Sequence, residues 1–269
     1  MMLRSAVSIA LSMWIAVPNA AQPGDLPHRD TFFKEVREAL ARSQEVWHRY
    51  AYTERRTELH MNPFGRMGTG GTRVTEVRPH ANPQLTYRRV IERNGVQVAK
   101  HELDRQDAEY RARVARVKRD AADADDDDRL ARTRAQLILD DAIKTLQFEL
   151  DRREMRNDRP MIVVTFAAKP DARPQTREGR LARVFAGSVW IDEASREVIE
   201  VRAVAKDDVS FGGFIAKVYE GTEAVVERRE IENGVWMPTR VTLSGNVRAL
   251  FRKTRIDHVI EWYDYRRVQ

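Results

Sequence analysis

The C-terminal half of the chain is a succession of β-prone segments joined by short connections, with no long helical pattern between them. These segments are Met161–Ala168, Arg183–Asp192, Glu197–Lys206, Phe214–Ile231, Thr239–Leu250 and Arg252–Arg266. Strands that follow one another through hairpins predict antiparallel pairing rather than βαβ units. Met161–Ala168 is apolar at consecutive positions, whereas Glu197–Lys206 alternates. This mixture indicates a mainly β, α+β domain whose sheet is partly covered by helices.

Two Asn-Gly pairs mark hairpins within this pattern. Asn94-Gly95 and Asn233-Gly234 each separate two β-prone runs. Both residues of such a pair tolerate a positive φ, so each pair predicts a type I′ turn. The remaining expected strands of the N-terminal half are 47–59, Thr72–Arg78, Leu85–Arg93 and Val96–Ala99, with a further one at Thr145–Arg153.

Helical periodicity is confined to the N-terminal half. Apolar residues recur at helical spacing over Thr31–Val46, and Asp30 is the expected N-cap. A helical insert is expected near residues 101–142, built from a helix over His101–Arg119, the acidic run Asp123–Asp128 and a second helix from about Arg129. The acidic run lacks the central glycine and ligand spacing of a calcium loop, so it predicts a solvated connection.

The first helix of this insert carries a narrow apolar stripe surrounded by arginines. Tyr110, Val114 and Val117 form the stripe. A helix of this kind either lies on an anionic membrane surface or packs its stripe against a sheet. The sequence leaves both interpretations open.

The N-terminus has the order of a secretory signal peptide. Arg4 precedes the apolar run Ala6–Val17, and the small residues Ala20 and Ala21 follow. The run is shorter than the ~20 residues that a membrane-spanning helix needs. We therefore expect residues 1–21 to be removed and residues 22–269 to form one β-rich domain in the periplasm, soluble after signal-peptide cleavage.

Composition narrows the class of protein further. The chain has no cysteine, so we expect neither disulfides nor lipid attachment through a cysteine. The net charge is +6, but acidic residues accompany the basic ones along the sequence. A dispersed charge on an exported chain argues against nucleic acid as a partner. Peripheral attraction to an anionic membrane surface remains open.

Motifs for catalysis or cofactor binding are missing from the sequence. The six histidines form no HExxH pair, and the glycine-rich stretch Gly65–Gly71 lacks the lysine of a phosphate-binding loop. Ser188 and Ser244 do not lie in a G-x-S-x-G nucleophile elbow. The sequence therefore predicts a protein that is not an enzyme and has no metal or cofactor site.

Aromatic residues on the expected strands are the candidate ligand-binding residues. They are Tyr50, Tyr52, Tyr87, Phe166, Phe185, Trp190 and Trp236. Such residues ordinarily fill a core. A sheet that curves around a cavity would use the same residues to line it and hold an acyl chain.

Several segments together resemble a family of exported bacterial proteins that are similar to outer-membrane lipoprotein-sorting and periplasmic lipoprotein-carrier proteins. The segments are YAYTERRTEL from Tyr50, YRRVIERNGVQV from Tyr87, REGRLARVFAGSVWIDEASREVIEVRA from Arg177, VSFGGFIAKVYEGT from Val209, NGVWMPTRV from Asn233 and EWYDYRR from Glu261. The resemblance implies a strongly bent antiparallel sheet, an unclosed half-barrel, with helices covering its concave side.

The same resemblance implies two functions. The first is a non-enzymatic periplasmic binding protein for a lipid, an acyl chain or a lipid-anchored protein. The alternative is an envelope scaffold or stress-sensing module that binds protein and has no lipid cavity. An open apolar pocket on the concave side would favour the first, and a filled concave side would favour the second.

Overall fold

The computed structural model describes residues 25–61, 67–80, 82–119, 140–211, 216–249 and 252–268. The expected signal peptide, the acidic run and residues 129–139 of the second expected insert helix lie outside these residues, whereas residues 140–145 are helical. In chain order the elements are α1 (Arg29–Trp47), β1 (Tyr50–Met61), β2 (Met67–Arg78), η1 (Pro83–Leu85), β3 (Tyr87–Arg93), β4 (Val96–Gln97), α2 (Lys100–Arg119), β5 (Leu146–Arg156), β6 (Arg159–Ala168), α4 (Arg177–Ala182), β7 (Phe185–Asp192), β8 (Val198–Ala205), β9 (Val209–Phe211), β10 (Ala216–Val218), β11 (Glu223–Glu232), β12 (Val235–Ala249) and β13 (Arg252–Arg267).

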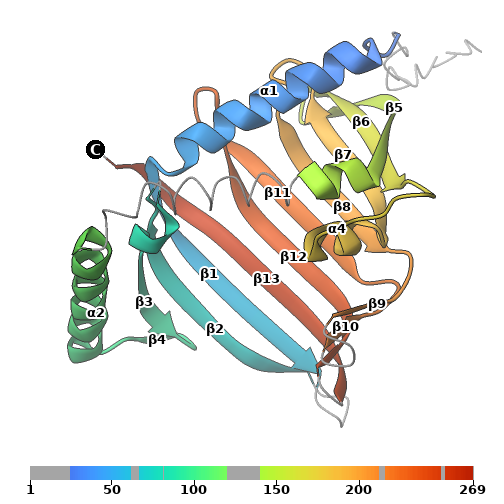
Figure 1. Cartoon of the computed structure of the whole chain (residues 1–269). Helices are drawn as coiled ribbons and strands as arrows, with labels where there is room; N and C mark the ends of the chain where they lie inside the picture. The colour runs from blue at the N-terminus through green and yellow to red at the C-terminus, as the bar shows by residue number, and fades with distance from the viewer. Residues whose placement is uncertain are drawn as a thin grey trace, which may run out of the picture.

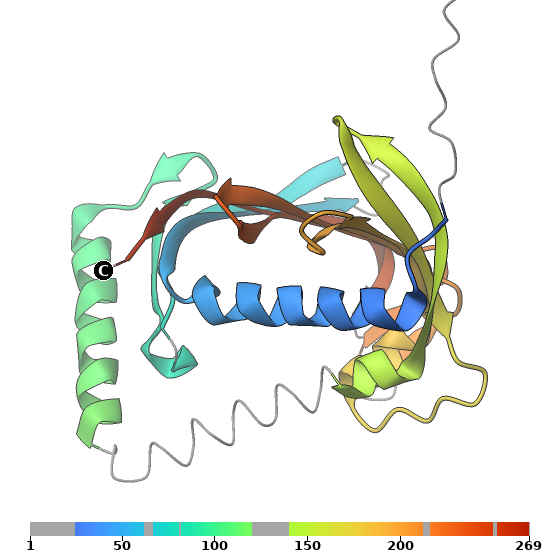
Figure 2. The same ribbon diagram turned by 90° about the horizontal axis from the view of Figure 1, so that it is seen from above.

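One antiparallel sheet dominates the molecule. Its strand order is β4-β3-β2-β1-β13-β12-β11-β8-β7-β6-β5, with the short β9 and β10 attached beside β12. The last strand pairs with the first, from Tyr50 opposite Arg267 onward, so β1 and β13 lie side by side inside the sheet. The terminal strands β4 and β5 do not pair with each other, and the sheet bends into an open half-barrel (Figures 1 and 2). The predicted fold class is confirmed.

Helix α1 crosses the concave side of the sheet (Figure 2). Its buried residues Phe32, Val36, Ala39 and Ser43 are spaced by four, three and four, which places them on one face of a helix. The predicted helix is confirmed with slightly wider bounds. The predicted N-cap is wrong, because His28 occupies that position and Asp30 lies in the first turn. A carboxylate there interacts favourably with the helix dipole without capping.

Strand β6 separates two clusters of apolar side chains. Ile162, Val164 and Phe166 face α1, whereas Met161 and Val163 face the convex side. Burial on both faces confirms the interpretation of this consecutive apolar run. Both faces of the sheet are therefore covered here, one by a helix and one by side chains of neighbouring strands.

Both predicted hairpins form, but the turn of the second hairpin is not of the predicted type I′. Asn94 and Gly95 both have positive φ (53° and 78°), as the type I′ turn between β3 and β4 requires. At the second pair only Gly234 has a positive φ (74°), so this turn is not type I′. Asn157 and Asp158, with φ of 49° and 60°, form the equivalent turn between β5 and β6.

The single strand predicted over Phe214–Ile231 is wrong. Residues 212–215 lie outside the described part of the chain, and the rest divides into β10 and β11. The break falls at Glu220 and Gly221, where Gly221 has a φ of 77°. Positive φ is ordinary for glycine and breaks the extended backbone of a strand.

Helix α2 stands beside the β3 end of the sheet rather than under its concave side (Figures 1 and 2). The ring centroids of Tyr110 and Tyr87 are 4.8 Å apart, and Gln106 exchanges two hydrogen bonds with the backbone of Val90. The apolar stripe of the helix thus begins with a residue packed on β3. None of the helices in the described ranges has the length and hydropathy needed to cross a bilayer.

Candidate functional site

An apolar groove lies between α1 and the concave face of β5–β8. Its volume is about 570 Å³, within the ~300–1,000 Å³ of small-molecule sites. The side chains that line it are Arg29, Asp30, Phe33, Lys34, Val36, Arg37, Leu40, Ile143, Leu146, Phe148, Val164, Phe166, Val189, Ile191, Val198 and Val201. We call this space the apolar groove.

The groove exists because α1 touches the sheet through only part of its apolar surface. Phe32 and Val36 are buried against the sheet, whereas Phe33 and Leu40 on the adjoining flank are only half-buried. Phe33 reaches Phe148 with ring centroids 6.3 Å apart, at one end of the groove. Along the flank the helix therefore overhangs the strands and leaves apolar side chains facing open space.

The floor of the groove comes from four adjacent strands. On β5 the residues are Leu146 and Phe148, and the ring of Phe148 lies 6.2 Å from that of Phe166 on β6. Successive side chains of a strand point to opposite faces, so residues two apart reach the groove on β5, β6 and β7. On β8 the lining residues Val198 and Val201 are three apart, beside a register shift with β7. The floor is continuous and apolar from β5 to β8.

Charged residues are restricted to the margin. Arg29, Asp30, Lys34 and Arg37 line the groove from α1. Arg29 donates to the carbonyl oxygen of Phe148 at 3.2 Å and its guanidinium also lies 3.5 Å from the Asp30 carboxylate. An apolar interior with a polar margin is suited to an elongated apolar group whose polar end remains near water.

Of the seven aromatic residues selected from sequence, one lines the apolar groove. Phe166 is that residue, and Phe185 packs against the same core cluster without lining the space. Tyr50 is buried and donates a hydrogen bond to the Glu232 carboxylate. The structure thus brings Phe166 and Phe185 together and places Tyr50 elsewhere.

The other tyrosines and Trp236 also lie away from the groove. Tyr52 packs against Tyr265 with ring centroids 5.6 Å apart, and Tyr87 donates to Asp107 at 2.5 Å. The Tyr87 hydroxyl is only part-buried, yet desolvation and the hydrogen bond to the Asp107 carboxylate raise its pKa to about 12. Trp236 is buried, with the Arg159 guanidinium 5.2 Å from its ring.

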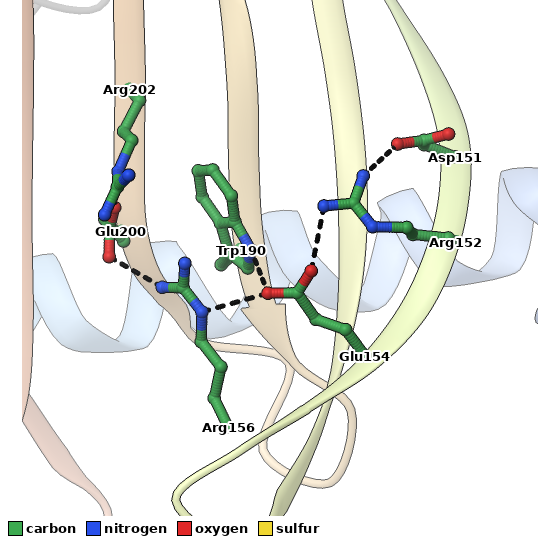
Figure 3. Close-up of polar contacts among 7 residues, drawn as sticks. All are labelled: Asp151, Arg152, Glu154, Arg156, Trp190, Glu200 and Arg202. Atoms are coloured by element: carbon green, nitrogen blue, oxygen red, sulfur yellow. Dashed lines mark hydrogen bonds and ion pairs between the residues drawn. The ribbon is translucent and has the colours of Figure 1, made fainter. Parts of the chain in front are cut away.

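Trp190 lies on the convex face, inside a charged network (Figure 3). Its indole N–H donates to Glu154 at 2.6 Å, and the guanidinium groups of Arg156 and Arg202 lie 4.4 and 5.3 Å from its ring. Arg156 bridges to Glu200 at 2.7 Å. We call Asp151, Arg152, Glu154, Arg156, Trp190, Glu200 and Arg202 the convex network.

The charges of the convex network compensate one another. It holds three carboxylates and three guanidinium groups, joined by ion pairs. Burial of Glu154 acts to raise the pKa of its carboxyl, but hydrogen bonds from Trp190 and Arg152 outweigh this and hold the pKa below its ordinary value. Each charged side chain of the convex network therefore has a partner of opposite charge within the network.

A buried cluster of three polar side chains connects α1 to the sheet next to the groove. Ser43 donates to Glu197 at 2.6 Å, and Arg228 reaches the same carboxylate at 2.9 Å. All three side chains are largely buried. A buried charge pair of this kind needs both partners and fixes the position of the helix on the sheet.

Most groove residues were not selected from the sequence because the selection used aromatic type rather than strand face. Leu146 and Phe148 alternate with polar Gln147 and Glu149, a pattern that indicates one apolar face. That signal identifies the face but not what lies opposite it.

Among the described residues, no three His, Asp or Glu side chains gather as metal ligands.

Comparison with known proteins returns solved structures only. No protein-family model matches the chain, and no curated protein sequence matches it. A LolA superfamily protein from Nitrosomonas europaea aligns with 87% of this chain and 93% of its own, at 8% identity and a TM-score of 0.33. A domain described as an outer membrane lipoprotein-sorting protein from Vibrio parahaemolyticus aligns with 88% and 92%, at 7% identity and a TM-score of 0.36.

The MucA/MucB complex from Pseudomonas aeruginosa also matches. It covers 87% of this chain and 99% of the matched chain, at 8% identity and a TM-score of 0.23. The resemblance to lipoprotein-sorting proteins noted in the sequence is confirmed at the level of these matches. Because the identities and TM-scores are low, the function proposed next depends on the side chains of this chain alone.

Proposed function

We propose that this chain is an exported, non-enzymatic binding protein that holds an acyl chain, as a free lipid or as the anchor of a lipid-anchored protein, in the apolar groove. Residues 1–21 direct export and are then removed, and the protein works in the periplasm. The observation that carries the proposal is the open apolar groove of about 570 Å³ under α1. A single acyl chain has the chemistry and elongated shape that its lining would accept.

The geometry of the groove supports an acyl ligand over a protein partner. A protein-binding scaffold without a lipid cavity would have a concave side filled by its own side chains. Here Val198 and Val201 on β8 and Leu40 on α1 remain half-buried and face the same space. Bringing these surfaces out of water with a ligand would contribute about 25 cal/mol for each Å² buried.

Filling the groove from within tests the proposal. The variant Leu40→Trp adds a bulky ring to the flank of α1 and should lower affinity for a fluorescent fatty-acid probe about tenfold, equivalent to about 1.4 kcal/mol. Anisotropy titration measures the affinity. The matched control is Val96→Trp on β4, where the native side chain is 69% exposed and away from the groove, and it should leave affinity unchanged.

The wild type provides the decisive result. If it binds no fatty-acid probe at micromolar concentration, the acyl-binding proposal is wrong and the scaffold function takes its place. Mass spectrometry of the natively extracted protein gives an independent readout, since an acyl-binding protein should carry co-purified lipid.

A further inference from the structure

A second cavity continues along the same helix beyond the apolar groove. Its volume is about 740 Å³, and we call it the basic pocket. The side chains that line it are Gln44, Trp47, His48, Tyr52, Pro79, His80, Gln84, Thr86, Arg88, Arg113 and Arg116. They come from the end of α1, from β1, from the β2–β3 connection, from β3 and from α2.

Both cavities lie along one flank of α1. The groove is lined by Phe33, Arg37 and Leu40, and the basic pocket by Gln44 and Trp47, which continue the spacing of four and three residues. Residues at this spacing share one face of a helix. Leu40 and Gln44 are about 6 Å apart along the axis at ~1.5 Å per residue. A single elongated molecule on this flank would therefore reach both cavities.

The basic pocket has a strong excess of positive charge. Arg88, Arg113 and Arg116 line it together with His48 and His80, and its described lining contains no carboxylate. Arg88 is paired, since it donates to Glu54 at 2.7 Å. Neither Arg113 nor Arg116 has a carboxylate partner among the residues that the structure describes. These two arginines thus leave uncompensated charge at the pocket.

Neutral groups hold Arg113 in place. Its guanidinium donates to the carbonyl oxygen of Thr86 at 3.1 Å and lies 5.4 Å from the ring of Tyr110. Its Nε is buried and has no hydrogen-bond partner in the described chain. Because this nitrogen has almost no accessible surface, a ligand in the basic pocket would contact the terminal nitrogens of the guanidinium group. Guanidinium groups bind phosphate oxygens strongly through two parallel hydrogen bonds.

The basic pocket also has aromatic side chains in its wall. Trp47 continues the flank of α1 and is 42% exposed. Tyr52 faces the same pocket from β1. The indole and the phenol ring give the pocket apolar contact area beside its arginines.

We propose that the basic pocket binds the phosphate of an amphiphile whose acyl chain occupies the apolar groove, so that the ligand class is a phosphate-bearing lipid. This inference rests on the proposed function, because it assigns the other end of the same ligand. The arginines Arg113 and Arg116 contact the phosphate oxygens, and the flank of α1 between the two cavities positions the chain.

Two amphiphiles with the same tail test the assignment. We expect the wild type to bind dodecyl phosphate about tenfold more tightly than 1-dodecanol, measured by displacement of the fatty-acid probe. The double variant Arg113→Gln/Arg116→Gln should lose this preference and keep its affinity for dodecanol, which also shows that it folds. The matched control Arg42→Gln removes an exposed cation of α1 that lines neither cavity and should preserve the preference.

Each alternative outcome has a separate meaning. If dodecanol binds as tightly as dodecyl phosphate, or if Arg42→Gln alone abolishes the preference, the pocket assignment is wrong while acyl binding stands. If neither amphiphile binds, both proposals are wrong. Inorganic phosphate should compete with dodecyl phosphate only weakly, and equal competition would show a site for the free anion, which contradicts the link to the groove.

Discussion

The two faces of strands β5–β8 are covered by different kinds of side chains. On the concave face, apolar side chains and α1 leave an open apolar groove, whereas on the convex face Trp190 is enclosed by the convex network (Figure 3). The convex face is complete because each carboxylate there has a guanidinium partner within the same sheet. On the concave face, half-buried apolar side chains face open space. The charged groups of the convex face are paired within the sheet, whereas the apolar surface of the concave face is only partly covered.

The largest effect is expected from Trp190→Ala on the convex face. Trp190 is buried, donates to Glu154 and lies between two guanidinium groups, so its removal leaves a void and takes away one of the hydrogen bonds to Glu154. We expect the free energy of unfolding to fall by about 3–5 kcal/mol. Denaturant titration measures it. The exposed Trp47→Ala should cost far less, and an equal loss for both would contradict the difference between enclosed and exposed tryptophans.

Phe166→Ala should have a smaller effect on stability and a clear effect on binding. Phe166 is 9% exposed and belongs to the core cluster, and its exposed edge lines the groove. We expect a loss of about 3 kcal/mol, at the lower end of the range for a buried aromatic residue, together with weaker fatty-acid binding. Phe185→Ala is the control, because Phe185 packs on the same cluster outside the groove and should lower stability alone. Unchanged probe affinity in Phe166→Ala would make the groove an ordinary core.

Glu154→Gln should weaken the convex network in a pH-dependent way. The pKa of Glu154 lies below its ordinary value of about 4.3, so the carboxylate stabilises the fold above that pH and loses its contribution as the pH falls through the folded-state pKa. We expect the variant to be less stable by about 1 kcal/mol at pH 7. Denaturant titrations from pH 7 to pH 3 should show this gap closing, and a gap that widens toward acid would contradict the assignment.

The smallest effect is expected at the outer end of the convex network. Asp151 pairs with Arg152, and both side chains are substantially exposed. Exposed ion pairs contribute about 0–1 kcal/mol because water competes for both charges. Asp151→Asn should therefore change the free energy of unfolding by less than about 0.5 kcal/mol. A loss as large as that of Glu154→Gln would show that the network acts as one cooperative unit.

The fold was largely predictable because short stretches of sequence specify most of its strands and turns. Alternation, consecutive apolar residues and Asn94-Gly95 specify strands and a turn within a few residues of sequence. The misassigned turn shows the limit of this information. Asn233-Gly234 has the preferred residues, yet only Gly234 has a positive φ, whereas Asn157-Asp158, which lacks glycine, forms a two-residue positive-φ turn between β5 and β6. A register shift between Glu230 and Glu232 lies directly beside the Asn233-Gly234 turn, and a bulge of this kind changes the local backbone path.

The candidate site was less predictable because it depends on which face of each strand is concave and on contacts between residues far apart in the sequence. Along β7, Phe185 and Val189 face α1, whereas Trp190 faces the opposite side. The alternation is visible in the sequence, but where α1 packs decides which set of alternate residues faces the concave side. The basic pocket is harder still, since Trp47, Arg88 and Arg113 belong to three elements whose proximity no short pattern encodes.

The unclosed sheet has a consequence for association between copies of the chain. In the described structure β5 pairs only with β6, so its outer edge presents unpaired backbone groups that another strand could join. A bulge between Leu150 and Arg152 interrupts the regular edge, and charged side chains follow along Asp151–Glu154. An approaching strand would meet a broken hydrogen-bonding pattern and a row of solvated charges. The open edge of the half-barrel is thereby protected against edge-to-edge aggregation.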